Sequence, residues 1–145
     1  MANLFQKIAG LFNPKPSAKP SATEVALNVI PPMIQLQLKL ALDKGSPANL
    51  LTDKYALGYI FGYHDAILQG LKVDNQTTCL AIMAVSYDTI FGGVDNAAPL
   101  FRKSLEIQND ETFRNGMIKG GGEAVAFFRE KKTLMGLSKW LIKME

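Results

Sequence analysis

The chain of 145 residues contains one histidine, His64, and one cysteine, Cys79. A single cysteine excludes an intrachain disulfide and is simplest to interpret as a thiol in a reducing, cytoplasmic setting. A single histidine means that every Ser-His-Asp triad would have to include His64, and no zinc-ligand spacing is present. The sequence therefore predicts no metal and no cofactor, assigns no catalytic residue, and leans against an enzyme.

The excess of positive charge is also small, because the net charge is only +3, and arginine occurs just three times. No basic stripe runs through the interior of the chain, so we expect no nucleic-acid partner. No run approaches the roughly 18 uninterrupted apolar residues that a membrane-spanning helix requires. We therefore expect no transmembrane segment.

Hydrophobic residues make up 48% of the chain, and their spacing is mostly helical. Residues 34–42 alternate like a strand, but Leu, Gln, Lys and Ala are helix formers and β-branched residues are nearly absent there. We expect helices whose approximate ranges are 22–30, stopped or kinked by Pro31-Pro32, then 34–42, 52–71, 75–91, 95–108, 110–128 and a last amphipathic stretch after 132. The predicted fold is an all-α, single-domain bundle of about five or six helices.

Four of the helix starts have candidate N-cap residues, and one helix has a glycine stop. The candidate caps are Thr52, Asp74 or Asn75, Asp95, and Asp110. Gly92-Gly93 is expected to close the helix that begins near residue 75.

The first 22 residues differ in character from the rest. Residues 1–12 form a predicted amphipathic helix, and residues 13–22 a Pro-, Lys- and Ser-rich linker before a helical domain at 23–145. The helix could dock on its own domain, on a partner or on a membrane through its apolar residues, which are Leu4, Phe5, Ile8, Leu11 and Phe12.

A pattern of glycines occurs twice, at 52–66 and again at 110–124, with an offset of 58 residues and no gap. Its shared form is acidic-x-aromatic-x-x-Gly-x-Ile-x-Gly-x-x-acidic-Ala. A glycine inside a helix costs about 0.5–1 kcal/mol relative to alanine, and two spaced by four are tolerated where another backbone approaches closely. We interpret the pattern as an internal two-fold repeat whose helices cross at Gly58, Gly62, Gly116 and Gly120.

Five residues on or beside these glycine stripes are candidate binding residues: Tyr55, His64, Asp65, Phe113 and Glu123. In a parallel crossing, Asp65 and Glu123 could come close enough to share a proton or hold a metal, whereas in an antiparallel crossing each would face an aromatic residue. His64 points about 100° away from Asp65 and is expected at the surface or at a groove edge.

The C-terminal stretch K-K-T-L-M-G-L-S-K-W-L-I-K-M-E combines an apolar stripe with lysines and the one tryptophan. Such a helix can bind a partner's groove or an acidic membrane surface through Lys139, Trp140 and Lys143, or simply pack on the core.

Three functions remain open from the sequence. The first is a non-enzymatic protein-interaction module that binds a protein partner or itself. The alternatives are a small-molecule or metal-binding bundle, with or without catalysis, that uses Asp65 and Glu123, and a peripheral protein held at the inner membrane surface by its terminal helices.

Overall fold

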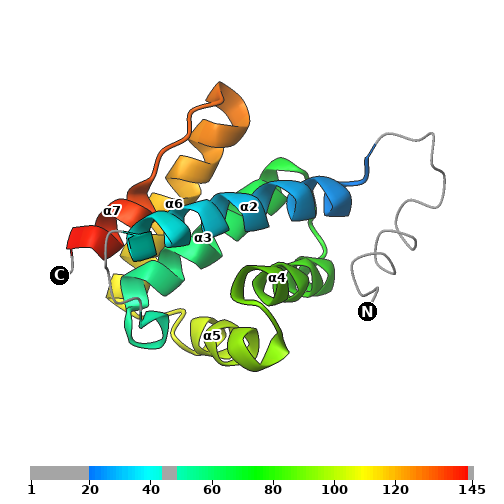
Figure 1. The fold of residues 1–145 in the computed structure, drawn as a ribbon. Coiled ribbons are helices and arrows are strands. Elements are labelled where there is room, and N and C mark those ends of the chain that lie inside the picture. Colours follow the sequence, from blue (N-terminus) through cyan, green and yellow to red (C-terminus); the bar gives the residue numbers. More distant parts are fainter. Residues whose placement is uncertain (1–19, 44–48, 144–145) are drawn as a thin grey trace.

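The computed structural model describes residues 20–43 and 49–143, and the regular secondary structure in these ranges is all helical, with no strand. The elements are α2 (Ala22–Asp43), the short 3-10 helix η1 (Leu50–Thr52), α3 (Lys54–Gly70), α4 (Gln76–Phe91), α5 (Val94–Glu106), α6 (Glu111–Glu130) and α7 (Gly136–Lys143) (Figure 1). The predicted all-α bundle is confirmed. The predicted N-terminal helix at 1–12, with Leu4, Phe5, Ile8, Leu11 and Phe12, lies outside the described residues.

Local sequence explains where several helices begin and end. Asn75 and Asp110 cap α4 and α6 as predicted, their side chains accepting from the backbone amides of Thr78 and Phe113. Gly92 ends α4 in the left-handed conformation, with φ 77°.

Two predicted caps are wrong. Asp53, not Thr52, caps α3, because Thr52 closes η1 and the Asp53 carboxylate accepts from Ala56 N at 3.0 Å. The α5 helix begins at Val94 after an N-cap at Gly93, so Asp95 lies within its first turn rather than before it. A carboxylate in the first turn still interacts favourably with the helix dipole.

Of the predicted stop or kink at Pro31-Pro32, the stop is wrong, because α2 is one helix of 22 residues that contains both prolines, and the kink stays a prediction. Each proline removes one backbone donor, and burial of the helix face that includes Ile30, Pro31 and Ile34 offsets that loss. By length and composition α2 could cross a membrane, with a mean hydropathy of 1.4, but a core helix of a soluble protein passes the same test. In the structure α2 packs against α3, α4 and α7.

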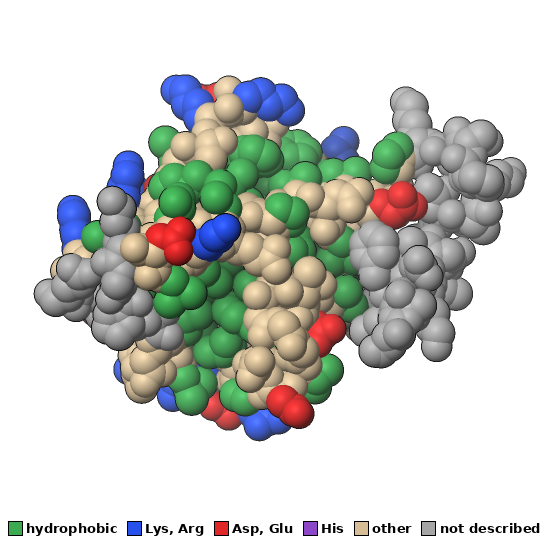
Figure 2. All heavy atoms as spheres, viewed as in Figure 1, with side chains coloured by type: hydrophobic (Ala, Val, Ile, Leu, Met, Phe, Trp, Pro, Cys, Tyr) green, Lys and Arg blue, Asp and Glu red, His purple; other side chains and the backbone are tan. Residues whose placement is uncertain are grey.

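The α3 helix is the centre of the bundle, since it contacts η1 and each of the five other described α-helices (Figure 1). Eleven of its 17 residues are buried. The outer surface is mixed, and the face drawn in Figure 2 shows hydrophobic side chains interspersed with charged ones of both signs. Half-exposed leucines such as Leu36 and Leu42 on α2 belong to this pattern.

The most extensive contact in the bundle is the one between α3 and α6, which run parallel. A Cβ atom on Gly58 would overlap the carbonyl of Phe113, and one on Gly116 would overlap that of Tyr55. The two backbones therefore touch where the glycines lie.

The contact is reciprocal one turn further along. Gly62 meets the backbone of Met117, and Gly120 meets that of Tyr59. Met117 follows Tyr59 by 58 residues, and Phe113 follows Tyr55 by the same 58. Equivalent positions of the two copies therefore make equivalent contacts, so the crossing has local two-fold symmetry. Whether the two segments arose by duplication stays a prediction.

Candidate functional site

The candidate residues separate into two groups in the structure. Tyr55, Glu123, Lys139, Trp140 and Lys143 line one pocket at the α7 end of the bundle. The remaining three, His64, Asp65 and Phe113, lie outside this pocket.

His64 is fully buried between α3 and α4, so its predicted place at the surface is wrong. Its Nδ1 lies 2.7 Å from the carbonyl of Ile60, which can only accept, so Nδ1 carries the proton. Nε2, also at 2.7 Å, therefore accepts from the hydroxyl of Ser86 on α4. Burial lowers the pKa of His64 to about 4, so the ring is neutral at pH 7. The apolar sequence around His64 could have indicated burial, whereas its partner Ser86 lies 22 residues away.

Asp65 and Glu123 have separate partners even though α3 and α6 cross in parallel. Asp65 accepts from Gln69 on its own helix at 2.8 Å, and burial raises the pKa of its carboxyl. Glu123 is 6% exposed and interacts with Tyr59, Lys119 and Gly136. Among the described residues no contact joins the two carboxylates, and no group of three His, Cys, Asp or Glu side chains could hold a metal ion.

Phe113 is a core residue, fully buried with its ring 5.9 Å from that of Phe61. No part of the ring is accessible to a ligand. The aromatic position of the repeated pattern is therefore exposed to the pocket only in its first copy, at Tyr55.

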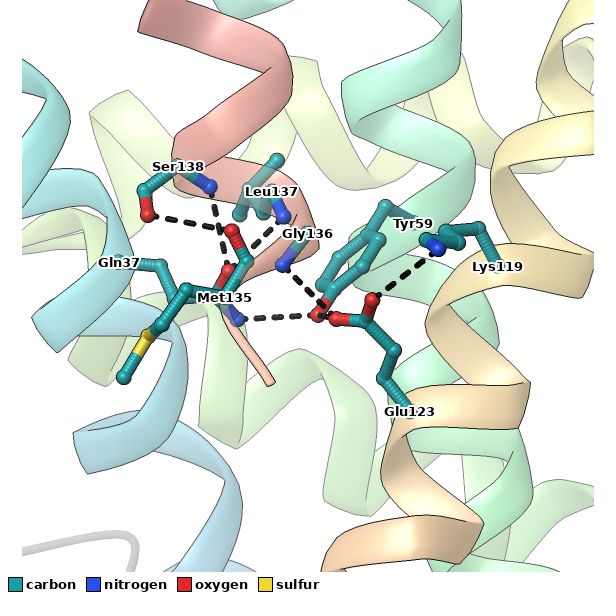
Figure 3. A network of polar contacts seen from close by, with 8 residues as sticks. All are labelled: Gln37, Tyr59, Lys119, Glu123, Met135, Gly136, Leu137 and Ser138. Atoms are coloured by element: carbon teal, nitrogen blue, oxygen red, sulfur yellow. Dashed lines mark hydrogen bonds and ion pairs between the residues drawn. The ribbon is translucent and has the colours of Figure 1, made fainter. Parts of the chain in front are cut away.

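Glu123 is held by a buried hydrogen-bond network (Figure 3). Its Oε1 accepts from the hydroxyl of Tyr59 at 2.5 Å and from the backbone amide of Gly136 at 2.9 Å, and Lys119 lies 3.5 Å from Oε2. Burial and the hydrogen bond to this carboxylate raise the pKa of Tyr59, which therefore remains a donor. A buried carboxylate needs such donors, because an unpaired charge is costly away from water.

The same network holds the N-terminal turn of α7 through Gln37 of α2 (Figure 3). Gln37 Oε1 accepts from the amides of Leu137 at 2.9 Å and Ser138 at 3.2 Å, and Gln37 Nε2 donates to the Tyr59 hydroxyl at 3.1 Å. The first N–H groups of a helix have no partner within the helix, and here Glu123 and Gln37 supply one. Side chains of α2 and α6 thus fix where the eight-residue α7 helix begins.

One wall of the pocket is a pair of stacked aromatic rings. Trp140 of α7 lies over Tyr55 of α3 with a centroid distance of 4.0 Å and an interplanar angle of 25°. The indole Nε1 donates to the carboxylate of Asp53, 3.1 Å from each oxygen. Asp53 therefore both caps α3 and orients Trp140.

The rest of the pocket is basic. Its volume is about 220 Å³, and its lining includes Lys119 of α6 with Lys139 and Lys143 of α7. Lys119 pairs with Glu123, whereas Lys139 and Lys143 make no ion pair with any described residue. Their side chains are exposed at the mouth of the pocket.

Sequence reasoning missed three residues of this site. Asp53 and Lys119 lie within the two copies of the repeated pattern but were not candidate residues, and Gln37 was not singled out from the helix predicted at 34–42. A signal existed for Lys119, which stands four residues before Glu123 and so on the same helix face. None existed for Gln37, since its contact with Leu137 spans 100 residues.

Comparisons with known proteins give no further indication of function: no family model, curated protein or solved structure matches the chain.

Proposed function

We propose that the chain is a non-enzymatic α-helical module that binds a partner protein at the pocket formed by α3, α6 and α7. The observation that carries the proposal is that Tyr55, Trp140 and three lysines meet in one accessible pocket. Tryptophan and tyrosine are common anchors of protein interfaces, and charged side chains around them add electrostatic complementarity with a partner.

The condition of the other reactive groups supports a binding role over a catalytic one. His64 and Ser86 are within hydrogen-bond distance, but both are fully buried and neither can reach a substrate without local unfolding. The Cys79 thiol contacts the carbonyl of Val73, and burial raises its pKa, which disfavours the reactive thiolate. The separate partners of Asp65 and Glu123 give no support to a shared acid–base or metal site.

The burial of the apolar side of α7 also supports a docking surface for a protein rather than an anchor that inserts into a membrane. Its apolar residues Leu137 and Leu141 are buried against the bundle, with exposed fractions of 0% and 3%. The exposed side chains of α7 are Lys139 and Lys143, and Trp140 and Ile142 are half-buried. A helix that lies in a membrane interface needs its apolar face free.

The proposal can be tested by affinity capture from the host's lysate combined with sedimentation over a range of concentrations. We expect a partner, or a second copy of the chain, to be retained by the wild-type protein and lost from the double variant Lys139→Glu/Lys143→Glu. The double variant Lys39→Glu/Lys72→Glu, which makes the same charge change away from the pocket, should retain it. A strictly monomeric protein that retains no partner would contradict the proposal.

A further inference from the structure

The pocket of the proposed interaction site has a charge pattern that selects its ligand. Lys139 and Lys143 are four residues apart on α7, so they lie on the same face of the helix. Like charges at this spacing destabilise a helix, and neither lysine has an ion-pair partner among the described residues. An anion bound between them would relieve this repulsion.

The third lysine is already partly neutralised. Lys119 lies 3.5 Å from Glu123 Oε2, and the carboxylate of Glu123 forms part of the pocket lining. The unbalanced positive charge is therefore carried by α7, next to the aromatic wall of Tyr55 and Trp140. In the nearby polar network, Oε1 of Glu123 and Oε1 of Gln37 already accept hydrogen bonds from backbone amides of α7.

The size of the pocket limits what can enter. A volume of about 220 Å³ is below the range of about 300–1,000 Å³ that is typical of sites for drug-sized molecules. It suits one or two side chains of a longer ligand. The stacked rings of Tyr55 and Trp140 supply an apolar part of the lining, against which the methylene groups of such a side chain can pack.

We infer that the pocket binds an acidic segment of the partner protein, with an Asp or Glu carboxylate held between Lys139 and Lys143 and its chain lying over Trp140. This inference rests on the proposed function, because it names the chemistry of the partner at the same site. A protein segment is favoured over a membrane because Leu137 and Leu141 are buried and leave α7 without a free apolar face.

Trp140 is the only tryptophan, so its fluorescence reports on this pocket alone. The full-length protein is titrated at low salt with a ten-residue peptide of alternating Glu and Ser, and in parallel with the same peptide carrying Gln for Glu. Inorganic phosphate and vesicles with an anionic phospholipid serve as the other two probes. We expect a saturable change with the Glu peptide only, weakened about tenfold or more by Lys139→Glu/Lys143→Glu and unchanged by Lys39→Glu/Lys72→Glu.

Equal responses to the Glu and Gln peptides, a response to phosphate as strong as to the Glu peptide, or a response to vesicles alone would each overturn the inference. Failure of the inference can be separated from failure of the proposed function. If the Glu peptide does not bind but Lys139→Glu/Lys143→Glu still loses a captured partner, the site binds a protein of another chemistry. If Lys139→Glu/Lys143→Glu retains every captured partner, the proposed function fails as well.

Discussion

The α3 helix meets α6 and α7 in two different ways. Against α6 it packs backbone to backbone at four glycines, whereas α7 is joined to the bundle by side-chain hydrogen bonds around Glu123 and Gln37. In the first contact, a Cβ atom added to any of these glycines would overlap the backbone of the other helix. The second is made by side chains along α7, because Leu137 and Leu141 are buried and Trp140 donates to Asp53, while Lys139 and Lys143 stay exposed. The comparison shows that α3 meets α6 through the backbone and α7 through side chains, and the proposed binding surface lies on the α7 side.

The largest expected effect tests the close contact of α3 with α6. Replacing Gly120 by Ala would place a Cβ atom against the carbonyl of Tyr59, where only backbone could move. We expect the free energy of unfolding to fall by about 3 kcal/mol or more, measured by chemical denaturation. Gly122→Ala is the matched control, because nothing lies within 4 Å of a Cβ there. Gly122→Ala should raise the free energy of unfolding by about 0.5–1 kcal/mol. Similar losses for Gly120→Ala and Gly122→Ala would contradict the close backbone contact.

The next prediction concerns His64, on the buried side of α3, and how the stability of the fold depends on pH. The folded pKa of His64 is about 4, below the ordinary value of 6.5. Between these values the unfolded chain binds a proton that the folded chain does not, so this contribution to stability is complete above pH 6.5 and is lost as the pH falls toward 4. From pH 7 to pH 4 the wild type should lose about 3 kcal/mol relative to His64→Gln.

The same comparison removes the effect of the neighbouring carboxyl group. The raised folded pKa of Asp65 acts in the opposite sense, because the folded state then binds its proton more readily as the pH falls. Asp65 is present in both proteins, so the difference between their stability curves isolates His64. Parallel curves over pH 4–7 would show that the ring is not buried in its neutral form.

A smaller effect is expected from the hydroxyl that links Gln37 to Glu123. Tyr59→Phe removes the donor to a carboxylate that is 6% exposed, and it should lower stability by about 2 kcal/mol. Tyr63→Phe is the control on the same helix, because the hydroxyl of Tyr63 makes no hydrogen bond with any described residue, and it should change stability by less than about 0.5 kcal/mol. Equal effects in thermal denaturation would indicate that the network does not contribute.

The smallest expected effect separates α7 from the rest of the bundle. Gln37→Met keeps the length of the side chain but removes its acceptor for Leu137 N and Ser138 N. We expect a loss of about 1 kcal/mol in global stability, together with a shift of Trp140 emission as α7 loosens. A shift of the same size in His64→Gln, which changes no residue near α7, would show that the emission reports general loosening rather than α7.

The fold was predictable because its determinants are local. Helical spacing, the Asn75 and Asp110 caps and the left-handed Gly92 all lie within the elements that they define. The continuous α2 helix was not predictable, since burial of Ile30, Pro31 and Ile34 against other helices decides whether two prolines can be accommodated. Tertiary packing overrides local propensity at such positions.

The candidate site was predictable only in part. Tyr55, Glu123 and the α7 residues were identified from their own helices, but that they meet in one pocket depends on Gln37 and Tyr59, whose contacts span 100 and 64 residues. His64 was placed wrongly, because its angle to Asp65 predicted a surface or groove-edge position, while the ring is buried against Ser86 of α4.

The most direct test of the central claim is amide hydrogen exchange of the full-length protein with and without the alternating Glu and Ser peptide. The account predicts added protection in α7, at Gly136 to Lys143, and unchanged exchange at the glycine crossing of α3 and α6. Protection that appears elsewhere, or exchange in α7 that does not respond to the peptide, would contradict it.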